Sequence, residues 1–402
     1  MPRSTPLPAP RETFHLERFF AATEFTTPHL LAVSDCESCT VADLLALEPG
    51  ARERLLGLRL GYTESAGSEE LRVAAAGLYG EVEPDDVLVH ATAVEVIYTT
   101  FRALLREGDR VVVQMPAYQA LRSAAELAGA EVVHWWGDSA RDWAPDLDEL
   151  DRLLDHPRAR LVVINTPHNP TGWVADDAFA EGVLDVVARR GVRLFCDEAY
   201  RGTERGNGSE PTGSASMADR DAAVLALGLV SKGLGLPGLR TGWLVARDPE
   251  VRRRVERYKD FTSICGPAPS ELLAAVALRQ SDALLSRSRR LLAANLDRLD
   301  AFMTRWSGWF EWRAPSGGSV TFPRLVDPDR WGGVAAFCER ARSEAGVLLA
   351  PGGLFSDARA DRADPRVAAV DASFRVGYGR ASFAEGLDAL ERWLRGVESP
   401  SE

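Results

Sequence analysis

Residues 226–243 of the chain read Ala-Leu-Gly-Leu-Val-Ser-Lys-Gly-Leu-Gly-Leu-Pro-Gly-Leu-Arg-Thr-Gly-Trp. An apolar run typical of a buried strand ends near one lysine, Lys232, and a glycine-rich turn containing Arg240 follows it. Apolar surroundings favour the neutral form of a lysine amine, which is the nucleophile of Schiff-base chemistry. The planar guanidinium of Arg240 suits a phosphate. On these residues alone, a strand that ends in a solvated Ser-Lys turn is the simpler interpretation, so the upstream segments must decide.

Length and charge limit the classes of protein to consider. With 402 residues, 46% of them hydrophobic, the chain can bury a large core and form two or three domains. Its net charge of −12 argues against a general nucleic-acid or anionic-membrane surface. No apolar run approaches the roughly 20 residues of a membrane span, and the proline-rich N-terminus lacks the apolar core of a secretory signal. We therefore expect a cytoplasmic protein with no nucleic-acid or membrane partner.

The five cysteines are too few and too scattered for a disulfide framework. Cys36 and Cys39 form a single Cys-x-x-Cys pair, whereas a structural zinc site normally needs a second pair. We expect no metal site and interpret these cysteines as small side chains in a packed loop, with thiol redox chemistry as the alternative.

Apolar strands and helices alternate through the first two thirds of the chain. The predicted strands are residues 87–90, 110–114, 131–135, 161–165, 193–197 and 224–229. The predicted helices are residues 14–25, 41–47, 68–79, 94–105, 118–128, 148–154 and 176–190. The strand at 161–165 is nearly all apolar, as is typical of parallel strands covered on both faces. The alternation predicts an α/β sheet with helices on both faces.

Beyond residue 253 the pattern changes. A long helical stretch at 270–305 precedes short strands that alternate with two helices, which indicates a smaller α+β domain. We expect four parts in order: a disordered tail at 1–13, an N-terminal segment at 14–50 that joins the small domain, a large domain at 51–285, and the small C-terminal domain at 286–402.

Polar residues follow several of these predicted strands. Asp197 ends the strand at 193–197, and the carboxyl end of a strand is where α/β sheets place ligands. A carboxylate there can cap a helix, or it can pair with a cationic ring nitrogen as a pyridoxal cofactor requires. Tyr200 lies three residues further on. Alone, this motif is equally consistent with a structural role.

Three further motifs add to this pattern. Asn169 lies in the turn-forming octet 165–172, and Tyr118 follows another strand. The predicted helix near Val94 offers free N–H groups to a phosphate at its start. Arg375 lies on a strand of the last domain, where it is either a salt-bridged residue or a clamp for a carboxylate.

Taken in order, these motifs resemble the pyridoxal-phosphate (PLP) enzymes of the aspartate aminotransferase fold, classes I and II, over residues 14–395. The resemblance implies fold type I, with a mostly parallel seven-stranded sheet in a large PLP-binding domain and a smaller α+β domain. It also implies that Lys232 forms the internal aldimine and shuttles protons, and that Asp197 pairs with the pyridinium nitrogen. The other implied cofactor contacts are Tyr200 and Asn169 at the phenolic oxygen, Tyr118 on the ring, Ala93, Val94, Ser231 and Arg240 at the phosphate, and Tyr62 from the neighbouring subunit.

The resemblance further implies that Arg375 binds the substrate α-carboxylate, with Asn169 beside it. The sequence departs from the family pattern at Thr92, where glycine is usual, and at Leu229, where a hydroxyl residue is common. No second arginine for a dicarboxylate substrate is recognisable. Because the loop at 34–38 is acidic, we predict that Glu37 contacts a cationic side chain of the substrate, the alternative being solvated loop acids.

These expectations define an aminotransferase that moves an amino group between an L-amino acid and a 2-oxo acid, as a homodimer. The alternative is a PLP-dependent cyclase, lyase or oxidase that acts on an arginine-derived amino acid. It is suggested by a weaker resemblance, around the loop and Thr40-Val-Ala-Asp-Leu44, to cyclases that form capreomycidine. An amino-acid-binding regulator would need an appended DNA-binding module, for which we expect no room at the N-terminus.

Overall fold

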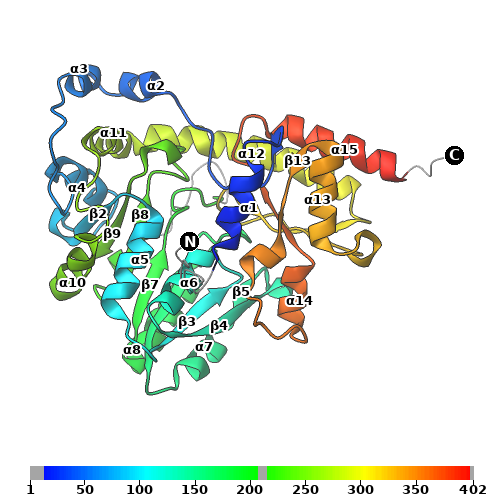
Figure 1. Ribbon diagram of the computed structural model, residues 1–402, viewed down its shortest axis with the longest axis horizontal. Helices are drawn as coiled ribbons and strands as arrows, with labels where there is room; N and C mark the ends of the chain where they lie inside the picture. The colour runs from blue at the N-terminus through cyan, green and yellow to red at the C-terminus, as the bar shows by residue number, and fades with distance from the viewer. Residues whose placement is uncertain (1–12, 207–214, 399–402) are drawn as a thin grey trace, which may run out of the picture.

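The structure is a computed structural model that describes residues 13–206 and 215–398. The predicted tail at 1–13, except Thr13, lies outside these residues. Figure 1 shows a central sheet with helices packed on it, and a second group of helices and short strands beside it. Among the described residues, no helix is both long and apolar enough to cross a membrane.

The central sheet has eight strands in the order β2-β9-β8-β7-β6-β3-β4-β5. They are β2 (Val87–His90), β3 (Arg110–Met115), β4 (Glu131–Asp138), β5 (Ala144–Pro145), β6 (Ala159–Asn165), β7 (Arg193–Asp197), β8 (Leu225–Leu229) and β9 (Gly242–Ala246). The pairs among β3, β4, β6, β7 and β8 are parallel, whereas β9 and β5 pair antiparallel to their neighbours. The expected mostly parallel sheet is confirmed. Strand β9 and the two-residue β5 had not been predicted.

Helices cover both faces of this sheet, as the sequence predicts. They are α4 (Glu69–Ala76), α5 (Ala93–Leu104), α6 (Gln119–Leu127), α7 (Leu147–Leu154), α8 (Asp177–Arg190), α9 (Met217–Arg220), α10 (Pro249–Lys259) and α11 (Ala268–Arg279). In β6, Leu161 and Val163 belong to the core under α5, α6 and α10, while Val162 and Ile164 belong to the core under α7 and α8. A strand buried on both faces therefore needs apolar side chains at consecutive positions.

The N-terminal segment crosses between the sheet and the rest of the chain (Figure 1). It contains α1 (His15–Thr23), β1 (His29–Leu30), α2 (Val41–Ala46) and α3 (Ala51–Leu56). Thr40 caps α2 through a reciprocal pair of hydrogen bonds with Asp43, as expected for a threonine before a helix. Helix α3 had not been predicted, because the Pro-Gly pair before it resembles a helix end; Gly50 instead starts α3 at φ +77°.

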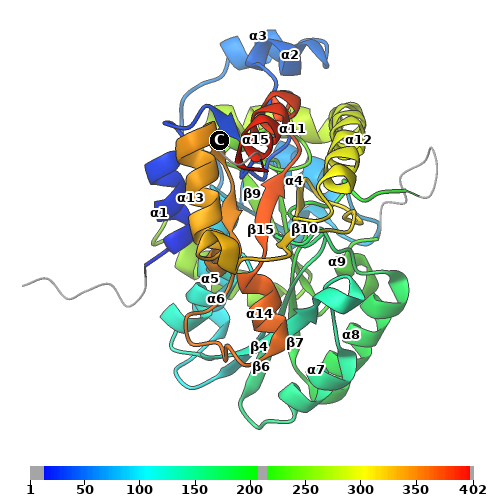
Figure 2. The ribbon, with the colours of Figure 1, turned by 90° about the vertical axis from the view of Figure 1, so that its right-hand side faces the viewer.

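The C-terminal third forms a second core (Figure 2). Its helices are α12 (Ser281–Arg305), α13 (Val334–Ala345), α14 (Pro365–Asp371) and α15 (Phe383–Glu398), and its strands are β10 (Phe310–Glu311), β11 (Val320–Thr321), β12 (Arg324–Leu325), β13 (Val347–Leu348), β14 (Ala350–Pro351) and β15 (Phe374–Gly377). The predicted helix at 270–305 is two helices that meet at Gln280. Leu31 and Cys36 of the N-terminal segment join this core. The exact division of the chain into domains stays a prediction.

Candidate active site

Lys232 lies three residues beyond the end of β8, in a turn that only glycine can complete. Gly235 has φ +68°, and a Cβ at this position would lie 2.5 Å from the backbone oxygen of Glu37. The Gly235 N–H donates to the Lys232 carbonyl at 3.0 Å, which closes the turn. Lys232 Nζ then donates to Ser34 Oγ at 2.8 Å. The lysine is therefore held by a hydroxyl from a segment about 200 residues away in sequence.

Asp197 ends β7, the neighbouring parallel strand. It is in register with Asn165 of β6 and Leu227 of β8, so the carboxyl ends of the three strands meet at one edge of the sheet. Its side chain is buried, and Oδ1 accepts a hydrogen bond from the Ala199 N–H at 3.0 Å. Burial raises the pKa of Asp197 to about 6, against the opposing effects of that hydrogen bond and of Lys232. A buried carboxylate of this kind gains from a cationic partner.

Tyr200 carries a buried hydroxyl that has no hydrogen-bond partner among the described residues. Its ring centroid lies 5.8 Å from Lys232 Nζ. Buried polar groups in folded proteins are nearly always paired, so an orphaned hydroxyl beside the lysine indicates a place for a ligand atom.

The start of helix α5 forms another wall of the same region. Thr92 caps the helix by accepting a hydrogen bond from the Glu95 N–H at 3.0 Å. The first N–H groups of the helix, at Ala93 and Val94, have no carbonyl one turn earlier to bind, which makes them donors for an anion. Arg240 adopts a left-handed backbone conformation at φ +50°, which is uncommon for a residue with a side chain and is often found at functional sites.

Arg375 of β15 is a buried cation. Its Nε and Nη2 donate to the Ala32 carbonyl at 3.1 and 2.6 Å, and Nη1 donates to Asn169 Oδ1 at 3.0 Å. Only 2% of the residue is exposed, and no carboxylate in the described part of the chain forms an ion pair with it. Burial accordingly lowers the pKa of Arg375. A buried guanidinium without a counter-charge is suited to a ligand carboxylate.

These residues line one cavity of about 340 Å³. The predicted site residues that border it are Ala93, Val94, Tyr118, Asn169, Asp197, Tyr200, Ser231, Lys232, Arg240 and Arg375. Two predicted residues do not border it. Tyr62 is 95% exposed, outside the cavity of its own chain. Glu37, predicted to contact the substrate, instead accepts a hydrogen bond from the Ala381 N–H at 2.8 Å, just before helix α15 begins.

Three charged residues of the cavity wall were missed in the sequence. Glu17 and Glu24 belong to α1 and its C-terminal cap, and Arg380 follows β15. Arg380 is an additional arginine at the cavity, although its charge is met by Asp35, whose carboxylate lies 2.6 Å away. The spacing of seven residues between Glu17 and Glu24 was the available signal, because it places two acids on one side of a helix.

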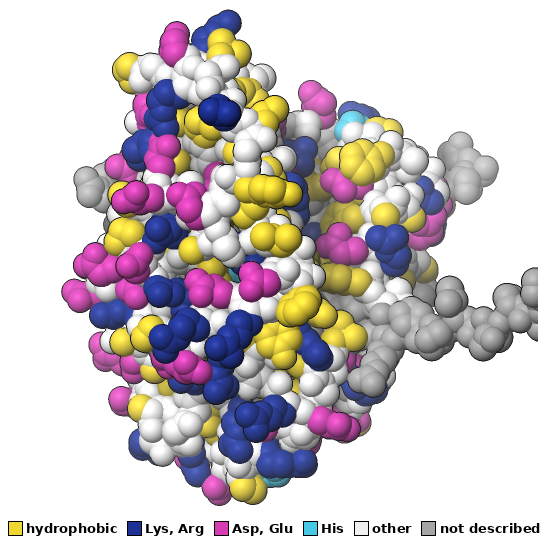
Figure 3. Space-filling view, turned by 60° about the vertical axis from the view of Figure 1, so that its left-hand side comes forward, with side chains coloured by type: hydrophobic (Ala, Val, Ile, Leu, Met, Phe, Trp, Pro, Cys, Tyr) yellow, Lys and Arg dark blue, Asp and Glu magenta, His cyan; other side chains and the backbone are white. Residues whose placement is uncertain are grey.

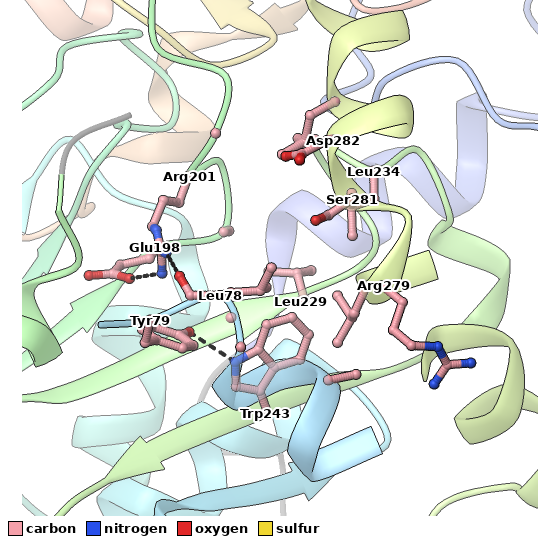
Figure 4. Close-up of a pocket in the computed structure, with 18 of the residues that line it drawn as sticks. Leu78, Tyr79, Glu198, Arg201, Leu229, Leu234, Trp243, Arg279, Ser281 and Asp282 are labelled. Carbon is pink, nitrogen blue, oxygen red and sulfur yellow. Dashed lines mark hydrogen bonds and ion pairs between the residues drawn. The ribbon is translucent and has the colours of Figure 1, made fainter. Parts of the chain in front are cut away.

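A larger cavity of about 1000 Å³ lies on the other side of Leu229 and Ala199, which border both. Figure 4 shows its wall, where Arg201 pairs with Glu198 and also donates to the Leu78 carbonyl. The Trp243 indole N–H donates to the Tyr79 hydroxyl at 2.9 Å. The chemistry-bearing lysine, Asp197 and orphaned tyrosine all border the smaller cavity, so we assign the active site there.

The family of the chain is shown by comparison with known proteins. Residues 38–371 match the family model "Aminotransferase class I and II", and the chain belongs to this family. The structure matches a PLP-dependent aminotransferase from Streptococcus suis (TM-score 0.85, 27% identity, 98% of this chain and 100% of the other). It also matches the PLP-dependent cyclase OrfR (TM-score 0.86, 28% identity, 98% and 100%). The chain is therefore a PLP-dependent enzyme of fold type I.

Two curated relatives indicate the range of activities in the family. The chain is 35% identical over 392 residues to capreomycidine synthase of Streptomyces vinaceus, which covers 96% of this chain and 93% of the relative. It is 25% identical over 363 residues to aspartate aminotransferase of Thermotoga maritima, covering 87% of each. Both the aminotransferase and the cyclase that the sequence suggested are thus represented among the relatives.

Proposed function

We propose that the protein is an aminotransferase that moves an amino group from an L-amino acid to a 2-oxo acid. The observation that carries the proposal is the convergence of Lys232, Asp197 and Arg375 on one cavity. Bound PLP supplies an aldehyde that combines with amines and a protonated ring that draws electrons from the amino acid Cα. The cavity offers an amine, an anion and a cation for these tasks.

Lys232 is the amine that we assign to the PLP aldehyde, and the base that removes the α-proton of the substrate. Its hydrogen bond to Ser34 Oγ fixes the direction of Nζ. We assign Asp197 to the ring nitrogen, because a buried carboxylate stabilises a proton on that nitrogen. The orphaned Tyr200 hydroxyl fits the phenolic oxygen of PLP, where Asn169 would join it.

The remaining predicted contacts complete the site. We place Tyr118 against the ring, the phosphate at the Ala93 and Val94 N–H groups, and Ser231 and Arg240 beside it. Arg375 would hold the α-carboxylate of the substrate, next to the side-chain amide of Asn169 that it already contacts. This arrangement directs the Cα–H bond into the cavity, where Lys232 can reach it.

We further propose that the enzyme works as a cytoplasmic homodimer, in which Tyr62 reaches the phosphate of the partner. Large hydrophobic side chains are exposed around α3 and after α10: Leu56, Leu60, Tyr62, Phe261 and Ile264. Figure 3, which turns the side bearing α3, α4 and α10 forward, shows hydrophobic side chains among the charged ones on this face. Exposed hydrophobic groups of this kind are typical of an interface between subunits.

A cyclisation or elimination at the substrate side chain is the second candidate. It is supported by the identity to capreomycidine synthase, which is 35% against 25% for the aspartate aminotransferase. Both reactions begin when Lys232 takes the α-proton. They diverge at the next step, which is either return of the proton to the cofactor side or loss of a leaving group from the side chain.

One experiment separates the two candidates. The holoenzyme is mixed with single L-amino acids, and cofactor absorbance and product mass are followed together, with Lys232→Ala as the control. Transamination converts the cofactor to its amine form and yields a 2-oxo acid, whereas cyclisation or elimination restores the starting spectrum. If no amino acid changes the spectrum, the proposal is wrong.

A further inference from the structure

Helix α1 brings two carboxylates to the wall of the active-site cavity. Glu17 lies in its first turn, and Glu24 is the residue that caps its C-terminus. Both border the cavity, together with Leu16 and Phe20 of the same helix. Side chains seven residues apart lie on the same side of a helix, so the two acids face the cavity as a pair along its length.

The charges of the cavity divide into an inner and an outer group. Lys232, Arg240 and Arg375 are the cations to which the proposed function assigns the cofactor and the α-carboxylate. In the outer group, Arg380 is already paired with Asp35 at 2.6 Å. Glu17 accepts a hydrogen bond from the Tyr118 hydroxyl at 3.2 Å, which leaves its negative charge uncompensated.

Glu24 has neither a hydrogen bond nor an ion pair to its carboxylate within the described part of the chain. It is half-buried, and burial and the neighbouring Asp35 raise the pKa of Glu24, against the opposing effect of Arg380. A carboxylate in these surroundings is stabilised by a cation that enters the cavity. Glu17, Glu24 and Asp35 outnumber the one outer cation, Arg380, so the outer end of the cavity is negative.

We propose that Glu24, supported by Glu17, selects substrates that carry a positive charge on the side chain, such as a guanidinium or an ammonium. The inference deepens the proposed function and rests on it, since it requires that an amino acid be held at Arg375. A substrate with a distal carboxylate would place a second negative charge against Glu24, while Arg380 is already engaged by Asp35.

The test compares two ligands that differ by one charge. L-Arginine and L-citrulline have the same length and nearly the same shape, but citrulline carries a neutral urea group. Spectral titration of the holoenzyme gives a Kd for each. In the wild type we expect arginine to bind roughly tenfold more tightly, as for a hydrogen bond to a charged group.

Glu24→Gln should remove most of this preference and leave the citrulline Kd unchanged, while Glu17→Gln should reduce the preference less. Glu24→Asp keeps the charge and should retain part of the preference, which separates recognition from a structural defect. Glu385→Gln, on the exposed surface of α15, is the control for the loss of one carboxylate and should retain the full ratio.

The failures are distinguishable. If neutral amino acids change the cofactor spectrum but arginine has no advantage over citrulline, or if Glu24→Gln keeps the wild-type ratio, this inference alone is overturned. If no amino acid changes the spectrum, the proposed function fails, and the inference fails with it.

Discussion

Arg375→Lys tests whether the buried guanidinium is a binding group or a structural one. In the structure the guanidinium donates two bonds to the Ala32 carbonyl and one to Asn169 Oδ1, and it has no ion-pair partner among the described residues. An ammonium keeps the charge but cannot present two parallel donors to a carboxylate. The loss of one charge-assisted hydrogen bond amounts to about 1.5–3 kcal/mol, or a roughly 10- to 150-fold weaker Kd.

A matched pair of ligands isolates this effect. L-Alanine and ethylamine differ by the α-carboxylate, and both can combine with the cofactor, so spectral titration gives the contribution of the carboxylate as a ratio of Kd values. We expect Arg375→Lys to weaken alanine binding and to leave ethylamine binding unchanged. Arg190→Lys, in an ion-paired cluster with Asp151 and Asp155 away from the cavity, is the control. Equal weakening of both ligands by Arg375→Lys, accompanied by a lower Tm, would refute the assignment.

Two further predictions concern the cofactor. The chain contains only two lysines, Lys232 and Lys259, so borohydride reduction followed by peptide mapping should place all bound cofactor on Lys232 and none in Lys232→Ala, with Lys259→Arg as the control; label on Lys259 would contradict the assignment. Asp197→Asn should slow exchange of the substrate α-proton in D₂O, and near-native exchange would count against the role of Asp197. Because burial raises the pKa of Asp197 to about 6, this carboxyl stabilises the apo protein at low pH, and that stability is lost as the pH rises through 6. Urea unfolding should therefore show the wild type losing about 3 kcal/mol relative to Asp197→Asn between about pH 4 and 7.

The sequence predicted the sheet and the inner end of the site because both depend on local patterns. The consecutive apolar residues of β6 and the polar residue after each strand are visible without a structure. Strand β9 was missed because it follows the glycine-rich turn directly and pairs antiparallel, between two strands distant in sequence. Gly242, its first residue, also lies where an added Cβ would come 3.3 Å from the Ala93 N, so its side-chain absence serves packing against α5.

The outer end of the site could not be predicted in the same way. Glu37 and Asp35 are adjacent in a loop, but Glu37 bonds to the start of α15 and Asp35 pairs with Arg380, both through contacts of more than 340 residues in sequence separation. Glu17 and Glu24 looked like solvated residues of an amphipathic helix, because nothing local shows that α1 packs beside the strand ends. Long-range packing therefore decides which acids reach the substrate.

The N-terminal segment also positions the catalytic lysine, and Ser34→Ala tests this role. Lys232 Nζ has its hydrogen bond with Ser34 Oγ at 2.8 Å, while the Ser34 carbonyl accepts a bond from the Ser319 hydroxyl at 2.7 Å in the second core. The serine thus connects the lysine to both halves of the chain. Loss of one neutral hydrogen bond amounts to about 0.5–1.5 kcal/mol, so α-proton exchange should slow by roughly 2- to 10-fold.

The cofactor should remain attached in Ser34→Ala, because Lys232 itself is unchanged, and Ser34→Thr should restore part of the rate by returning a hydroxyl. α-Proton exchange measured by NMR in D₂O, beside the fraction of bound cofactor, separates positioning from binding. If Ser34→Ala exchanges at the wild-type rate, the segment closes the cavity without directing the lysine. If it loses the cofactor altogether, Ser34 supports the binding site and not the proton transfer.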